Sequence, residues 1–152
     1  MTTTTLTWGI KESLIAYIER LEDGVFETIA GASRTGNEFR FPLDAAASQF
    51  DAETQQGVLQ FRGSVIITGH WGGMRVEIND PRITLSGETG EISTLIKSVF
   101  GDDSNITFGT LNVTSPAPQL TAAVTLAPGG QSLMGQQYSV GQELSPLSIS
   151  WS

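Results

Sequence analysis

The chain has 152 residues, the size of one domain that can bury a single core without disulfides or a structural metal. Its 8 basic and 16 acidic residues give a net charge of −8, and this excess of negative charge disfavours nucleic acid and anionic bilayers as partners. It contains no cysteine and one histidine, which excludes disulfides, thiolate metal sites, thiol nucleophiles and any site that needs two histidines. We therefore expect one domain over residues 1–152 with no nucleic-acid partner.

The first predicted element is an amphipathic helix within WGIKESLIAYIERLEDG, residues 8–24. Its apolar residues recur at helical spacing, at Ile10, Leu14, Tyr17, Ile18 and Leu21. Charged residues occupy the other positions, and the pair Asp23-Gly24 is typical of a helix end. On this wheel Tyr17 is expected to point inward.

From residue 25 onward, short segments rich in Val, Ile, Thr and Phe alternate with Gly, Pro, Asn and Asp, a pattern typical of antiparallel β-structure. Eight or nine strands are expected, the clearest being Val25–Ala30, Glu38–Phe41, Gly57–Gly69, Met74–Asn79, Arg82–Ser86, Glu91–Val99, Ile106–Thr114, Gln119–Leu126 and Ser145–Trp151. The pattern predicts a mainly β fold, an antiparallel β-sandwich with one N-terminal amphipathic α-helix.

Templates for catalysis are missing from the sequence, which has no nucleophile elbow, Walker loop or dinucleotide fingerprint. The adjacent carboxylates Asp102 and Asp103 could bind calcium or act as acid and base. Their position beside a glycine and an asparagine is more typical of a solvated turn. Trp8, Trp71 and Trp151 could form a sugar-stacking platform, although tryptophans at segment ends more often belong to the core or its rim. A carbohydrate- or protein-binding β-sandwich module is therefore kept as an alternative.

Three stretches of the chain carry motifs in a fixed order. The first is WGIKESLIAYI at residues 8–18, and the last is GQQYSVGQELSPLSIS at residues 135–150. Between them, residues 41–92 contain Phe-Pro-Leu, Asp-x-x-Thr-x-x-Gly, Thr-Gly-His-x-Gly, Asn-x-Pro-Arg-Ile and Gly-x-x-Gly. From Leu6 to Ser150 the chain resembles the HtaA domain, the heme transport-associated domain of actinobacterial heme-uptake proteins.

The resemblance implies a function for the lone histidine and for one of the two tyrosines. The family's iron ligand falls on Tyr17 and its hydrogen-bonding partner on His70. The implied function is binding of ferric heme b and its transfer, for heme and iron acquisition, to other heme-uptake proteins of the cell envelope. With the lone histidine assigned to Tyr17, no separate acid–base group is left, so we expect a carrier and not an enzyme, and a heme-dependent enzyme is kept as a further alternative. This pairing is chemically sensible, because a phenolate is a hard oxygen donor suited to Fe(III) and a neighbouring imidazole can take its proton.

Residues near this pair are candidates for the walls of a heme pocket. Those expected to line its apolar part are Phe61, Ile67, Trp71 and Met74. Lys11 and Ser13, near the helix start, are expected to contact the propionates. Tyr138 is the alternative iron ligand, but the motif places that function on Tyr17.

No apolar run is long enough to span a bilayer. The first residues, MTTTTLTW, lack both the basic and the apolar part of a signal peptide. The resemblance implies an extracellular or cell-envelope location, and a cytoplasmic one stays open.

Overall fold

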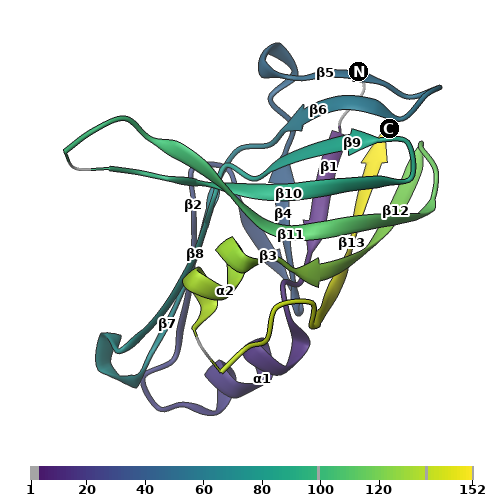
Figure 1. Ribbon diagram of the computed structural model, residues 1–152. Coiled ribbons are helices and arrows are strands. Elements are labelled where there is room, and N and C mark those ends of the chain that lie inside the picture. Colours follow the sequence, from purple (N-terminus) through teal and green to yellow (C-terminus); the bar gives the residue numbers. More distant parts are fainter. Residues whose placement is uncertain (1–3, 99, 136, 152) are drawn as a thin grey trace.

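The computed structural model describes residues 4–98, 100–135 and 137–151 (Figure 1). Its strands are β1 (Thr4–Trp8), β2 (Val25–Ile29), β3 (Ser33–Thr35), β4 (Glu38–Pro42), β5 (Gln49–Asp51), β6 (Gln56–Gln60), β7 (Ser64–Gly69), β8 (Met74–Asn79), β9 (Arg82–Ser86), β10 (Thr89–Ile96), β11 (Ser104–Ser115), β12 (Gln119–Leu126) and β13 (Glu143–Trp151). The helices are α1 (Glu12–Arg20) and α2 (Pro128–Met134), with short 3₁₀ turns η1 (Ala45–Ala47) and η2 (His70–Gly72). None of these described helices has the length and apolar character needed to cross a membrane.

The strands form two antiparallel sheets, which confirms the predicted mainly β fold class. The larger sheet has the order β3-β4-β1-β13-β12-β11-β10-β9-β6-β5, and the smaller one has the order β2-β7-β8. In Figure 1 the large sheet curves around the core, and the small sheet descends along one side. The two chain ends meet at the top, where β1 pairs with β13, while α1 lies at the opposite end.

Helix α1 is shorter than predicted, because the segment before it is extended. Trp8 lies at the end of β1, where its ring is buried and its Nε1 donates to the Ser145 carbonyl at 2.8 Å. The helix buries Leu14, Ile15 and Ile18 against the core. It also ends earlier than the predicted stop at Asp23-Gly24, because Leu21 is already extended and its N–H donates to the Ile18 carbonyl. The chain then turns closely at Gly24, where a Cβ would lie 2.0 Å from the Ile18 carbonyl oxygen.

The predicted strand Gly57–Gly69 is wrong, since it is two strands in different sheets. Residues of β6 pair with β9 in the large sheet, whereas β7 lies between β2 and β8 in the small one. The break falls at Gly63, which has a φ of +115° and whose Cβ would lie 2.5 Å from the Ala32 nitrogen. Glycine adopts this φ without strain and leaves room for Ala32, which allows the chain to turn from one sheet to the other.

Several elements were not predicted. The strands β1, β3 and β5 are short or lie outside the clearest Val- and Ile-rich runs. Helix α2 has Pro128 at its first position, where the missing N–H carries no penalty. The end of the predicted strand Glu91–Val99 at Val99 lies outside the described residues, and β10 covers Thr89–Ile96.

The core is one continuous cluster that joins both sheets and α1. Its largest fully buried side chains are Trp8, Phe39, Phe41, Phe61, Phe108, Leu6, Ile10, Leu14, Ile15, Ile18, Ile67 and Ile78. The Trp8 and Phe108 rings meet edge to face, with centroids 5.6 Å apart and planes at 88°, a geometry that adds to the gain from burial.

Replacing Trp8 by alanine should lower the free energy of unfolding by about 3–5 kcal/mol, because it leaves a cavity and an unpaired carbonyl. Urea unfolding followed by circular dichroism measures this loss. The matched control is Trp71→Ala, at a side chain that is 87% exposed, which should change stability by no more than about 0.5 kcal/mol. Equal losses in the two variants would contradict the assignment of Trp8 to the core.

Candidate functional site

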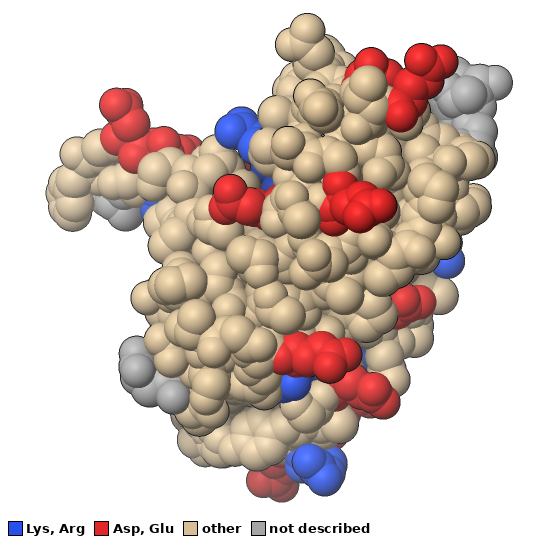
Figure 2. All heavy atoms as spheres, turned by 45° about the vertical axis from the view of Figure 1, so that its right-hand side comes forward, with Lys and Arg blue, Asp and Glu red and all other residues tan. Residues whose placement is uncertain are grey.

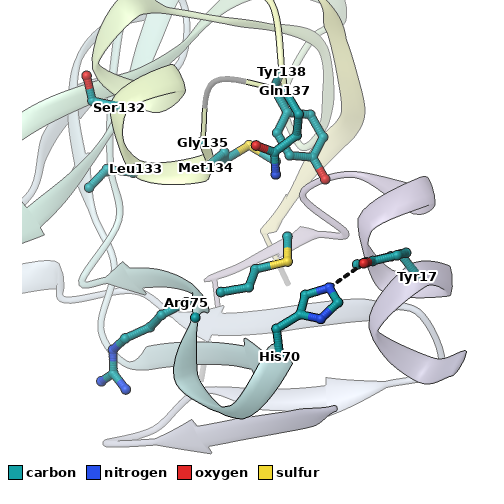
Figure 3. A pocket seen from close by; sticks show the side chains of 11 residues that line it. Tyr17, His70, Arg75, Ser132, Leu133, Met134, Gly135, Gln137 and Tyr138 are labelled. Carbon is teal, nitrogen blue, oxygen red and sulfur yellow. Dashed lines mark hydrogen bonds between the residues drawn. The ribbon is translucent and has the colours of Figure 1, made fainter. Parts of the chain in front are cut away.

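Tyr17 and His70, which lie 53 residues apart in the sequence, are hydrogen-bonded side chain to side chain, between the phenol oxygen and Nε2. Tyr17 projects from α1 and His70 from the tip between β7 and β8, and Figure 3 shows the two pointing at each other. Their ring centroids are 5.6 Å apart with planes at 46°. The structure therefore brings together the two residues singled out from the sequence.

The prediction that Tyr17 points inward is wrong. Its side chain is 38% exposed, whereas Leu14, Ile15 and Ile18 form the buried stripe of α1. Tyr17 lies at the margin of this stripe, so its ring leaves the core and its hydroxyl reaches a pocket at the surface.

The backbone around His70 has an uncommon conformation. His70 and Trp71 have φ angles of +52° and +55°, in the left-handed region that few residues other than Gly adopt, although Asn, Asp and His do so more often than the rest. The Gly73 N–H donates to the His70 carbonyl at 2.9 Å, and Gly72 follows Trp71 with a φ of +88°. These angles are those of a type I′ turn with Trp71 and Gly72 at its centre.

The pair opens into a pocket of about 610 Å³ between α1, the β7–β8 tip and the segment from α2 to residue 138. Its lining is Tyr17, His70, Gly73, Met74, Arg75, Ser132, Leu133, Met134, Gly135, Gln137 and Tyr138. Three of the lining side chains are apolar or thioether groups. The lining also includes both tyrosines of the chain. The pocket thus combines an apolar wall with two phenols and one imidazole.

Tyr138 faces the pair from the wall opposite, above it in Figure 3. Burial raises the pKa of the Tyr138 phenol above its usual value of 10.0, and the nearby Tyr17 adds to this. The hydroxyl therefore stays neutral at physiological pH and can donate a hydrogen bond to a ligand in the pocket.

The four predicted wall residues lie in three environments, which are the pocket, the core and the solvent. Met74 lines the pocket. Phe61 and Ile67 are fully buried in the core and do not reach the pocket, so their expected contact with a ligand is not supported. Trp71 points outward at 87% exposure and is not among the lining residues described. Neighbouring positions on a strand or tight turn thus face different environments.

Lys11 and Ser13 lie in a different depression, next to Glu143 and Ser145. The Lys11 ammonium donates to the Glu143 carbonyl at 3.1 Å, which holds it at the start of α1 and away from the Tyr17–His70 pocket. Arg75 lines that pocket, but its guanidinium pairs with Glu77 at 3.2 Å and points away from His70 in Figure 3.

One wall of the pocket was missed from the sequence. It comes from Leu133, Met134 and Gln137, at the end of α2 and just beyond it. Pro128 at the first helical position is a signal for this helix, but two glycines follow it and weaken the helical pattern.

The other candidate sites do not form in the described part of the chain. Trp8 is buried, Trp71 is exposed at the β7–β8 tip, and Trp151 stacks on Phe50 with centroids 5.9 Å apart. They share no platform. The Asp103 carboxylate accepts the Ser98 N–H at 2.9 Å, and the described residues include no cluster of three metal-ligating side chains.

The fold and the site define a class, a curved antiparallel β domain with a tyrosine–histidine pair in a pocket at one end. The chain belongs to the HtaA family, whose model matches residues 3–150. A comparison with curated proteins finds no match.

Solved structures from Corynebacterium glutamicum share this fold. The C-terminal domain of HtaA aligns with a TM-score of 0.82 at 27% identity, covering 98% of this chain and 95% of that one. The N-terminal domain of HtaA gives a TM-score of 0.82 at 21% identity, with 99% and 96% coverage. The heme binding protein HtaB gives 0.73 at 19% identity, with 100% and 96% coverage.

Raising the pH above about 10 should destabilise the protein, in part through Tyr138. The unfolded chain loses the phenol proton near its ordinary pKa, whereas the folded chain retains it to higher pH, so the free energy of unfolding falls across that interval. Urea unfolding at a series of pH values measures the fall, which should be smaller in Tyr138→Phe. An identical pH dependence in this variant would contradict a buried, neutral Tyr138.

Proposed function

We propose that this protein binds ferric heme b with Tyr17 as the axial ligand and His70 as the partner of that ligand. The main observation in support of this proposal is the Tyr17–His70 hydrogen bond at the edge of a pocket of about 610 Å³. Membership of the HtaA family supports the proposal, as does the likeness in fold to a protein described as heme binding.

The chemistry of the pair suits oxidised heme. A phenolate is an anionic oxygen donor, and such donors bind Fe(III) more strongly than they bind Fe(II). The phenol must lose its proton to bind iron, and the Nε2 of His70 is already hydrogen-bonded to that oxygen. The imidazole can therefore accept or share the proton and strengthen the ligand without touching the metal.

The rest of the pocket fits a flat, largely apolar ligand with polar edges. Its volume lies within the range of about 300 to 1,000 Å³ usual for small-molecule sites. Met74, Leu133 and Met134 offer apolar and thioether contacts to a porphyrin. The neutral Tyr138 hydroxyl is a donor for a propionate or for a water on the iron.

The same features favour a carrier over an enzyme. The chain's one imidazole is engaged with Tyr17, so it is not available as a separate acid–base group for peroxide chemistry. Protonation of His70 or reduction of the iron would weaken the Tyr17–iron bond and provide a release route. We infer transfer to other heme proteins and, from the family, an extracellular or cell-envelope location.

Purified protein titrated with hemin should saturate at one equivalent and develop the visible spectrum of a high-spin ferric phenolate complex. In Tyr17→Phe the charge-transfer band should disappear, because the variant keeps the ring and loses only the ligand oxygen. Tyr138→Phe, which removes the pocket's other phenol, is the matched control and should keep the band.

A wild-type spectrum identical to that of free hemin would refute the heme proposal. The carbohydrate- or protein-binding alternative would then be tested through quenching of the exposed Trp71 by added oligosaccharides. A band that survives in Tyr17→Phe and disappears in Tyr138→Phe would instead assign the ligand to Tyr138.

His70→Ala should retain a phenolate spectrum but bind hemin about 10- to 100-fold more weakly, the usual effect of losing a partner of a metal ligand. Spectrophotometric titration with hemin measures both affinities. Equal affinity in His70→Ala and the wild type would show that His70 does not assist Tyr17.

A further inference from the structure

A side chain outside the pocket contacts the turn that carries His70. The Asp23 carboxylate accepts a hydrogen bond from the Trp71 backbone N–H. Asp23 lies in the turn between α1 and β2, and Trp71 is the residue directly after His70. This contact joins the end of the helix that carries Tyr17 to the tip that carries His70.

The His70 tip needs such support from outside. Two consecutive residues, His70 and Trp71, have left-handed φ angles, and for a bulky residue such as Trp71 this conformation is strained and needs support from surrounding contacts. The Trp71 indole provides no anchor of its own, since it is 87% exposed. The Asp23 carboxylate instead holds the backbone N–H of Trp71, the second of these two residues.

The segment that contains Asp23 also packs closely on the end of β7. A Cβ on Gly69 would lie 2.6 Å from Leu21 Cδ1 and 3.1 Å from Ile18 Cδ1, so the helix rests directly on the backbone before His70. Leu21 lies one helical turn after Tyr17. The packing of Leu21 on Gly69 holds the end of α1 against the strand that leads to His70, and the Asp23 bond joins the same two segments.

We propose that Asp23 is a positioning residue, which holds the β7–β8 tip in the left-handed conformation that presents His70 Nε2 to the Tyr17 phenol. Its effect on ligand binding rests on the proposed function, but its effect on the Tyr17–His70 hydrogen bond does not. Asp23 contacts a backbone group, so the identity of the Trp71 side chain does not affect this contact.

The first test needs no ligand, because the chain contains one histidine, and selective ¹⁵N-histidine labelling of the untagged protein gives the Nδ1 and Nε2 signals of a single imidazole. Tyr17→Phe defines the Nε2 resonance without the hydrogen bond to Tyr17. In Asp23→Ala the resonance should move from the wild-type position toward that reference. In Asp23→Asn, which keeps an acceptor oxygen and tolerates turns, it should stay near wild type.

The matched control is Glu22→Ala, which removes a carboxylate of the same charge from the exposed neighbouring residue. Its imidazole resonance should equal that of the wild type. A wild-type resonance in Asp23→Ala would overturn the proposal, and so would equal shifts in Glu22→Ala and Asp23→Ala, which would mean a general effect of charge. Circular dichroism establishes that each variant is folded.

The second test is a double-mutant cycle with hemin. Asp23→Ala should weaken hemin binding about 3- to 10-fold, less than His70→Ala, because Asp23 acts through the imidazole. The Asp23→Ala/His70→Ala double variant should bind within about twofold of His70→Ala alone. Fully additive losses would overturn the proposal. Absence of hemin binding by the wild type would refute the heme proposal alone, since the imidazole resonance still decides the function of Asp23.

Discussion

The close approach of α1 to the backbone of β7 is the constraint on which the site depends. Gly69 has no side chain, so Ile18 and Leu21 pack directly on the strand end. A larger residue there would separate the helix from the β7–β8 tip and with it Tyr17 from His70. The hydrogen bond between residues 53 positions apart is therefore a consequence of how the core closes at this end of the molecule.

Alternation and turn chemistry made much of the fold predictable. Strands β8, β9 and β12 have the predicted bounds, because each is a short Val-, Ile- or Leu-containing run between turn residues. Predictions failed where one local sequence pattern was compatible with two different structures. Residues 57–69 read as one apolar strand, yet the tight contact of Gly63 with Ala32 sends the two halves into different sheets, and no local pattern reports a distant neighbour.

The site was predictable as far as its motifs extend and no further. Tyr17 and His70 were identified through the resemblance, and the structure places them in contact. Spacing alone could not assign Phe61 and Ile67 to the core or turn Trp71 outward, because a neighbouring pocket and the core present the same apolar pattern. Asp23 was recognised only as part of a helix end, since its partner is a backbone N–H that depends on the hairpin fold.

Tyr17 and His70 lie outside the buried core, although other residues of their pocket pack against it. The buried cluster that joins both sheets includes neither Tyr17 nor His70, so the fold does not need a ligand to complete it, unlike small domains that fold around a metal. Carboxylates are spread over the face shown in Figure 2 with few cations among them, and a net charge of −8 favours solubility with the pocket empty or filled. The buried core can therefore stay folded whether or not a ligand occupies the pocket.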